Sequence, residues 1–103
     1  MKNTIKSHKN FNFEGMPRIA EPAFFMKYRP KLFKVGKFGL ISSKKIFKTS
    51  VKRNRAKRLL KAWIKEVELP SKFDFLFIAR SEILETYKDS GLEQLKKALT
   101  KIK

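Results

Sequence analysis

The sequence predicts an α+β fold: a single small domain built on a mixed β-sheet. Its 103 residues, 42% of them hydrophobic, are enough for one modest core. Strand-like stretches at 38–43 and 73–80 flank a segment at 50–67 that has the apolar spacing of a helix. A strand, a helix and a second strand in this order are typical of a βαβ crossover, in which the two strands run parallel. Because an earlier strand is also predicted, the sheet is expected to be mixed.

The earlier strand is predicted at 23–29, where Pro30 ends it. Side chains alternate between the two faces of a strand, and one face receives Phe24, Met26 and Tyr28. The other face receives Phe25, Lys27 and Arg29. An aromatic ring beside cations on one sheet face is a common way to hold single-stranded nucleic acid. The alternative interpretation is that the aromatic rings belong to the core, which must hold for one of the two faces.

The remaining strands and the last helix follow from local patterns. A hairpin turn at Pro30-Lys31 or at Gly36 is predicted to lead into the strand at 38–43. The stretch 73–80 is apolar at nearly every position, as expected for a central strand covered on both faces. A connection with helical character follows, and Ser90 and Glu93 then match a capping box. The amphipathic helix predicted after that box has the apolar positions Leu92, Leu95, Leu99 and Ile102.

The helix predicted at 50–67 separates into two faces at 3.6 residues per turn. Its apolar stripe comprises Ala56, Leu59, Leu60, Trp63, Ile64 and Val67. Its opposite face comprises Asn54, Lys57, Arg58, Lys61 and Lys65. The first turn adds further cations, although the helix dipole disfavours each of them there by about 0.3–1 kcal/mol. Thr49 or Ser50 could cap this end, and the helix is expected to end near Val67.

Positive charge is concentrated in the first two thirds of the chain. The net charge is +17, and up to position 65 there are 19 Lys and Arg residues against two acids, Glu14 and Glu21. From position 66 onward seven basic residues balance seven acidic ones, so this part is interpreted as scaffold. A merely soluble protein would intersperse the two signs. The asymmetry indicates a polyanion, either nucleic acid or, as a minor alternative that the core-facing apolar stripe disfavours, an anionic membrane.

Catalytic and metal sites are poorly supported. The chain has no cysteine, so a Cys-ligated zinc site is not available. Its single histidine, His8, has no visible partner and is interpreted as a solvated side chain, so a Ser/His/Asp arrangement has almost nothing to build on. There is no Gly-rich phosphate loop and no H-E-x-x-H pattern, so we expect no catalytic and no metal-ligating residue. No apolar run is long enough to span a membrane, and the N-terminus lacks an apolar signal core, so a cytoplasmic location is expected.

Structured RNA is favoured over DNA as the partner, because a rigid helical row of cations gains most from a partner with a fixed fold. Asn54, Arg55 and Ala56 are superficially similar to the basic region of a leucine-zipper protein, but no leucine heptad follows them. A helix-turn-helix is disfavoured because no second short helix is predicted just before the basic one.

Three motifs in succession resemble the protein component of bacterial ribonuclease P. The central motif, the "RNR" stretch of that family, is Arg53-Asn54-Arg55-x-Lys57-Arg58-Leu59-x-Lys61. The motif before it is Gly39-Leu40-x-x-Ser43-Lys44-Lys45, and the motif after it is Phe75-x-Phe77-Ile78-Ala79-Arg80. Looser upstream matches are Phe25-x-x-Tyr28 and the pattern Ile5…Phe11…Gly15. The dense part of the match covers residues 38–80.

The resemblance implies an αβββαβα fold with a four-stranded mixed sheet and a left-handed βαβ crossover, an exception to the usual right-handed rule. Residues 1–103 would form one RNA-binding domain. The segment between Phe11 and Gly15 is shorter than in the family pattern, so residues 1–22 are expected to be mobile or to carry a shortened first helix.

The resemblance also implies a role as a subunit of an endoribonuclease that removes the 5′ leader of precursor tRNA. The partners would be a catalytic RNA, which would carry the chemistry and the Mg²⁺, and precursor tRNA; DNA and membranes are not expected as partners. The residues expected to bind the RNA subunit are Lys44, Lys45, Lys52, Arg53, Asn54, Arg55, Lys57, Arg58, Lys61 and Lys65. Those expected to bind the leader are Phe11, Phe13, Phe25, Lys27 and Tyr28. Two alternatives are a structural RNA-binding protein of ribosomal type without leader preference, and a stand-alone nuclease.

Overall fold

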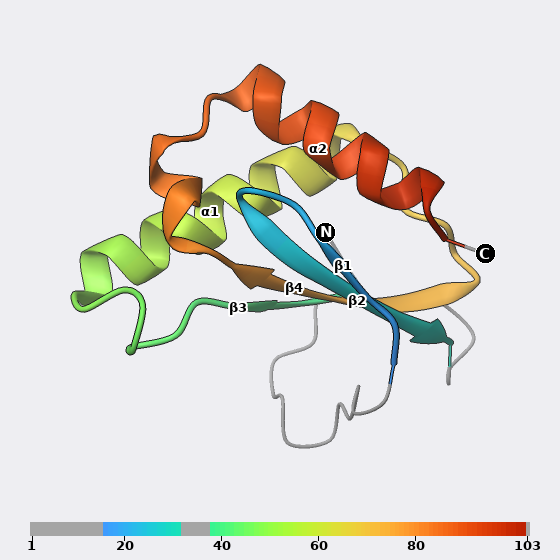
Figure 1. The fold of residues 1–103 in the computed structure, drawn as a ribbon, viewed down its shortest axis with the longest axis horizontal. Coiled ribbons are helices and arrows are strands. Elements are labelled where there is room, and N and C mark those ends of the chain that lie inside the picture. Colours follow the sequence, from blue (N-terminus) through green and yellow to red (C-terminus); the bar gives the residue numbers. More distant parts are fainter. Residues whose placement is uncertain (1–15, 32–37, 103) are drawn as a thin grey trace.

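The computed structural model describes residues 16–31 and 38–102 and shows a four-stranded sheet with helices on one side (Figure 1). The strands are β1 (Arg18–Ala20), β2 (Phe24–Pro30), β3 (Phe38–Ile41) and β4 (Phe73–Ala79). The helices are α1 (Ser50–Glu66), the 3₁₀ helix η1 (Ser81–Glu85) and α2 (Lys88–Thr100). The predicted α+β class is confirmed. The first helix that the resemblance implied would fall at residues outside the described ones.

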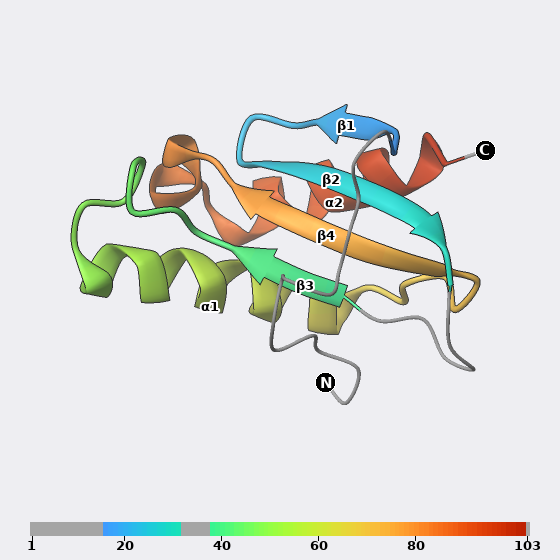
Figure 2. The same ribbon diagram turned by 90° about the horizontal axis from the view of Figure 1, so that it is seen from below.

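The strand order β1-β2-β4-β3 makes the sheet mixed, as predicted (Figure 2). β2 pairs antiparallel with β1 and with β4, whereas β3 pairs parallel with β4. The connection between the two parallel strands contains α1, so the predicted βαβ unit is present. Its left-handed sense stays a prediction. β4 lies between β2 and β3 and is therefore a central strand, as predicted.

The predicted hairpin between β2 and β3 is wrong, because β4 lies between these two strands. Proline and glycine mark turns, but a turn signal does not specify which strands pair. The seven residues of β2 pair with β4 along their whole length, from Phe24 opposite Ala79 to Pro30 opposite Phe73. That register brings many more apolar side chains together than the four residues of β3 could offer. Residues 32–37 themselves lie outside the described part of the chain.

The local pattern of residues 1–22 did not locate β1, although the four-stranded sheet implied by the resemblance requires one more strand. Its three residues lie between Pro17 and Pro22 and are too few to show a period of two. Two reciprocal backbone hydrogen bonds of 2.8 and 3.3 Å between Glu21 and Phe24 hold the tight connection to β2. β1 is therefore placed by its pairing with β2 and not by a propensity of its own.

The main core lies between one face of the sheet and the two helices α1 and α2 (Figures 1 and 2). Its largest fully buried side chains include Trp63, Phe24, Phe38, Phe47, Phe75 and Phe77. The opposite face of the sheet, called the open face below, carries a smaller apolar cluster of Ile41, Leu76 and Ile78. No helix of the described residues covers the open face, yet Asp74 and Leu76 of β4 are only 1% and 7% exposed there, so the expectation that β4 is buried on both faces is confirmed.

One buried ion pair lies on the open face. Arg29 Nε donates to Asp74 Oδ2 across the β2–β4 pairing, at 3.3 Å. Asp74 is only 1% exposed, so this carboxylate needs a cationic partner to be tolerated inside the protein. Arg29, which shares this face with Phe25 and Lys27, is thus neutralised within the fold.

α1 is oriented as its two-faced pattern predicts. The buried or half-buried positions that pack into the core are Ala56, Leu59, Leu60, Trp63, Ile64 and Val67. Thr49 is the N-cap residue, and its hydroxyl accepts a hydrogen bond of 3.2 Å from the backbone N–H of Lys52. Phe47 is 1% exposed and anchors the loop before the helix in the core. The start, the end and the facing of this helix are therefore confirmed.

α2 begins earlier than predicted. Its N-cap residue is Tyr87, which makes no side-chain capping bond, so the predicted capping box at Ser90 and Glu93 is wrong. Ser90 lies within the first turn, where its Oγ accepts a hydrogen bond of 3.2 Å from Gln94 Nε2. A Ser and a Glu three positions apart recur by chance in a helix with many polar residues, so the match did not locate its start.

α1 and α2 come into close contact where Gly91 meets Trp63. A Cβ atom on Gly91 would lie 2.7 Å from Cδ2 of the Trp63 ring and closer still to two other ring carbons. Only glycine fits at this position without displacing the ring. At the surface, Lys88 Nζ lies 2.8 Å from Glu66 Oε2 and joins the same two helices. The hydrogen bond to Glu66 raises the pKa of Lys88.

Replacing Leu60 by alanine is expected to lower the free energy of unfolding by about 2–5 kcal/mol, because the fully buried side chain leaves a cavity. The matched control is Lys61→Ala, the next residue along, whose side chain is exposed. Its effect is expected to stay within about 0.5 kcal/mol. Urea unfolding measures both, and similar losses for the two variants would show that the facing of α1 is wrong.

Gly91→Ala is expected to destabilise the protein by about 1–3 kcal/mol, because the added methyl group overpacks the contact with Trp63. In an exposed helix the same change would stabilise by nearly 1 kcal/mol, so the sign of the effect reports the close approach. Thermal unfolding followed by Trp63 fluorescence is the measurement. Lys96→Ala on the exposed side of α2 is the control, and a stabilised Gly91→Ala variant would contradict the packing described here.

Candidate nucleic-acid interface

Cationic side chains line the solvent-facing side of α1 and the turn before it. Exposed positions are Lys44, Lys45, Lys52, Asn54, Arg55, Lys57, Arg58, Lys61 and Lys65. Arg53, which is half-buried, completes the set, and we call these ten residues the cationic ridge. The only acid within α1 is Glu66, its last residue. The structure thus brings the residues expected to bind the RNA subunit together on α1 and the turn that precedes it.

The ridge has no acidic partners in the ion pairs of the described residues. Those pairs join Arg29 with Asp74, Lys88 with Glu66 and Lys101 with Glu21, and none includes a cation of the ridge. Like charges held on one helix repel one another at close spacing. A polyanion relieves that repulsion, so the ridge has the electrostatic character of a phosphate-binding surface.

A groove of about 400 Å³ lies where the ridge meets the edge strand β3. Its lining residues are Leu40, Asn54, Lys57, Arg58 and Lys61. The aliphatic side chain of Leu40 provides an apolar patch beside three cations and one amide. Such a groove can accept a sugar or base against the apolar patch while the cations contact phosphates, and Asn54 can donate to and accept from a base edge.

Arg53 has a structural role that the sequence analysis did not find. Its Nη1 donates a hydrogen bond of 2.9 Å to the backbone carbonyl of Phe47, and its own carbonyl accepts one of 3.0 Å from Ser42 Oγ. These bonds join the end of β3 and the loop that carries Lys44 and Lys45 to the first turn of α1. Arg53 therefore positions part of the ridge as well as adding charge to it.

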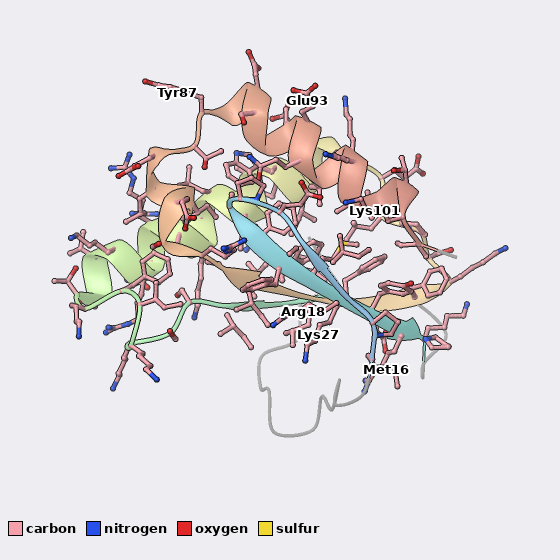
Figure 3. The ribbon with its side chains drawn as sticks, viewed as in Figure 1. Met16, Arg18, Lys27, Tyr87, Glu93 and Lys101 are labelled. Carbon is pink, nitrogen blue, oxygen red and sulfur yellow. The ribbon has the colours of Figure 1, made fainter. Side chains whose placement is uncertain are left out.

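The open face of the sheet carries a second group of cations around an aromatic ring. The register pairs Arg18 with Lys27, and both side chains project away from α1 and α2 (Figure 3). The guanidinium carbons of Arg18 and Arg80 lie 4.5 and 4.7 Å from the centre of the Phe25 ring. Sequence reasoning missed Arg18 because β1 was not predicted. Arg80 could have been found, since alternation along β4 places it on the same face as Ile78.

The five residues expected to bind the leader are not brought together. Phe25 and Lys27 share the open face, as alternation along β2 predicts. Tyr28 lies on the opposite face, where its ring packs edge-on against Phe73 at 5.6 Å and contributes to the core. It therefore does not line the same surface as Phe25. Phe11 and Phe13 lie outside the described residues.

Acidic side chains do not gather into a reactive or metal-binding site in the part of the chain that the structure describes. No group of three or more His, Cys, Asp or Glu residues there could hold a metal ion. A hydrogen bond from Ser81 lowers the pKa of Glu82, but this is an exposed surface contact. None of the helices between residues 16 and 102 has the length and apolar character needed to cross a membrane.

The fold and these two surfaces define a small, strongly basic α+β domain suited to bind a polyanion. The family model for ribonuclease P matches residues 1–103, so the chain belongs to the ribonuclease P protein family. A curated relative, the "Ribonuclease P protein component" of Dehalococcoides mccartyi (strain CBDB1), is 36% identical over 78 residues, or 76% of this chain. The match spans 63% of the length of that relative.

Solved structures with the same fold come from two other bacteria. The RNase P protein of Staphylococcus aureus superimposes with a TM-score of 0.76 at 20% identity, over 97% of this chain and 94% of that chain. The RNase P protein of Thermotoga maritima gives a TM-score of 0.74 at 21% identity, over 88% of this chain and 87% of that chain. These similarities establish the fold, including the four-stranded mixed sheet with its two helices.

The two arginines Arg53 and Arg58 are expected to respond differently to substitution. Arg58→Ala should reduce the slope of log affinity for RNA against log salt concentration by about one, while leaving the unfolding midpoint unchanged. Arg53→Ala should also lower the free energy of unfolding, by about 1 kcal/mol, because the bond to Phe47 is lost. Arg53→Lys keeps the charge but not the forked donor. It should therefore retain the salt slope and show the same loss in free energy of unfolding as Arg53→Ala. Equal stability of all three variants would contradict the structural role of Arg53.

Proposed function

We propose that this chain is the protein subunit of a ribonuclease P holoenzyme, in which it binds a catalytic RNA and the 5′ leader of precursor tRNA. The single observation that carries the proposal is the cationic ridge on α1, which has no acid before Glu66 and no ion-pair partner among the described residues. Membership of the ribonuclease P protein family supports the same role.

The ridge would hold the RNA subunit by its phosphates. Arginine can clasp two phosphate oxygens with its forked donors, whereas lysine acts as a point charge. About six to ten such contacts would make the affinity fall by roughly 10³–10⁵ between 50 and 200 mM salt. The rigid helix fixes the spacing of the cations, which favours a folded RNA with phosphates at matching positions.

The open face would hold the leader as a single strand. Arg18, Lys27 and Arg80 surround Phe25 there, and Asp74 is already paired with Arg29. Because mature tRNA lacks the leader, contacts on this face would favour the precursor over the product. In this role the RNA subunit, together with its Mg²⁺, would carry out the cleavage itself, as the family resemblance implies.

Reconstitution with a cognate catalytic RNA at low Mg²⁺ tests the proposal. Adding the wild-type protein is expected to raise the rate of leader cleavage, because bound cations lower the charge repulsion between the RNA and its substrate. Lys96→Ala, a change on the exposed side of α2, is the control that should behave as wild type. Cleavage that does not increase when the protein is added would reject the proposal.

A structural RNA-binding protein of ribosomal type is the second candidate, because the cationic ridge alone would serve such a role. The two functions differ in their dependence on the leader. Equal affinity of the protein–RNA complex for precursor and mature tRNA would favour the structural role. Cleavage by the purified protein without any RNA subunit would instead indicate a stand-alone nuclease.

A further inference from the structure

We infer that Phe25 is a positioning residue, whose ring holds Arg18 and Arg80 as a pair of phosphate-binding groups on the open face. The inference rests on the proposed function, because the ligand is the phosphate backbone of a single-stranded leader. It differs from the sequence-based expectation that an aromatic residue on this face stacks on a base. We call the three residues the Arg–Phe–Arg group.

The strand register places the two arginines on opposite sides of Phe25. Phe25 is paired with Ala20 of β1 and with Ile78 of β4. Arg18 precedes Ala20 by two positions and Arg80 follows Ile78 by two, so each arginine is a diagonal neighbour of the ring. Because both partner strands run antiparallel to β2, one arginine lies towards the end of β2 and the other towards its start.

Both guanidinium groups are close enough to interact with the ring. Their central carbons lie 4.5 and 4.7 Å from the ring centre, within the range in which a cation is attracted to an aromatic face. The two arginines come from the strands on either side of β2 and lie towards its opposite ends, so in the proposed arrangement each covers one face of the ring. A base would have to displace one of them to stack on Phe25, and the half-buried ring offers it no other face.

The two arginines keep donors available for a ligand. Arg80 Nη1 donates a hydrogen bond of 3.0 Å to the backbone carbonyl of Glu21, which fixes this side chain at the β1–β2 connection. A guanidinium has five N–H donors, so one bond to a carbonyl leaves others free to reach a phosphate. Arg18 is exposed and stands beside Lys27, which adds a third positive charge.

A single strand that crosses this group would be recognised by its phosphates and not by its bases. The group would therefore bind leaders of any sequence, including a leader whose nucleotides lack bases. Separating two guanidinium groups by an apolar ring also keeps them from moving apart or collapsing onto one another, so that little side-chain entropy is lost on binding.

The test uses the reconstituted protein–RNA complex and precursor tRNA with either an ordinary leader or a leader made abasic over its whole length. Mature tRNA measures the affinity that does not depend on the leader. The variants are Phe25→Leu, Phe25→Tyr, Arg18→Ala and Arg80→Ala, with Lys96→Ala as the matched surface control. Thermal unfolding of each protein shows whether the fold is retained.

We expect wild-type complexes to bind the ordinary and the abasic leader with equal affinity. Phe25→Leu should weaken binding of both precursors by about two- to five-fold and leave mature tRNA unaffected, and Phe25→Tyr should restore binding because it keeps the ring. Each Arg→Ala change should reduce the salt slope for precursor by about 0.7, the value for one phosphate of a single strand. In an Arg18→Ala, Arg80→Ala background, Phe25→Leu should have no further effect.

Two results would overturn the inference while leaving the proposed function intact. One is an abasic leader that binds wild type at least five-fold more weakly, with the difference lost in Phe25→Leu, since this is the behaviour of a base-stacking ring. The other is a Phe25→Leu variant that binds precursor tRNA with the affinity of wild type. Equal affinity of the wild-type complex for precursor and mature tRNA would overturn the proposed leader site, and with it the inference.

A measurement on the free protein is independent of RNA. Protons of a guanidinium over an aromatic ring are shifted upfield by the ring current, so the side-chain signals of Arg18 and Arg80 should move downfield in Phe25→Leu and stay in place in Phe25→Tyr. Unchanged signals in Phe25→Leu would show that the ring does not hold the arginines and would overturn the inference.

Discussion

The packing of the apolar stripe of α1 against the sheet determines how the rest of the structure is arranged. Four buried residues of this helix, Ala56, Leu60, Trp63 and Ile64, fix its rotation about its own axis. Once they face the core, the intervening Lys and Arg residues have no direction left except solvent or the edge of β3. The same packing holds α2 in place through the contact between Trp63 and Gly91. The packing that forms the core therefore also exposes the cationic ridge.

The parts of the fold that the sequence predicted depend on local information. Helix α1 was predicted with its ends and its facing because a periodic stripe and a capping Thr49 lie within one segment. Strand pairing is a non-local property, which is why the hairpin between β2 and β3 was wrong and β1 was missed. The capping box at Ser90 failed because a Ser and a Glu three positions apart also occur inside a helix, and α2 begins at Lys88 with Tyr87 as its N-cap residue.

In the candidate site, too, residues close in sequence were predicted together, whereas residues brought together by strand pairing were not. The residues of the ridge lie close together in sequence, so they were predicted as a group. The hydrogen bonds of Arg53 with Phe47 and Ser42, and the groove beside Leu40, required the structure. The Arg–Phe–Arg group draws its three residues from β1, β2 and the end of β4, and it exists only because β4 lies beside β2. Tyr28 and Phe25 lie on opposite faces of the sheet, as alternation along the strand already implied.

The two surfaces lie at opposite edges of one sheet: the ridge and its groove adjoin β3, whereas the Arg–Phe–Arg group lies at β1 and β2. A sheet with paired strands throughout is rigid, so the distance between the surfaces is fixed. In the proposed role, a precursor tRNA bound to the RNA subunit would present its leader at a high effective concentration to the open face. Weak, sequence-tolerant contacts with the leader would then suffice, because the RNA subunit supplies most of the affinity. A surface of few phosphate contacts is what such a role requires, and a tight, base-reading site would slow the release of the cleaved leader.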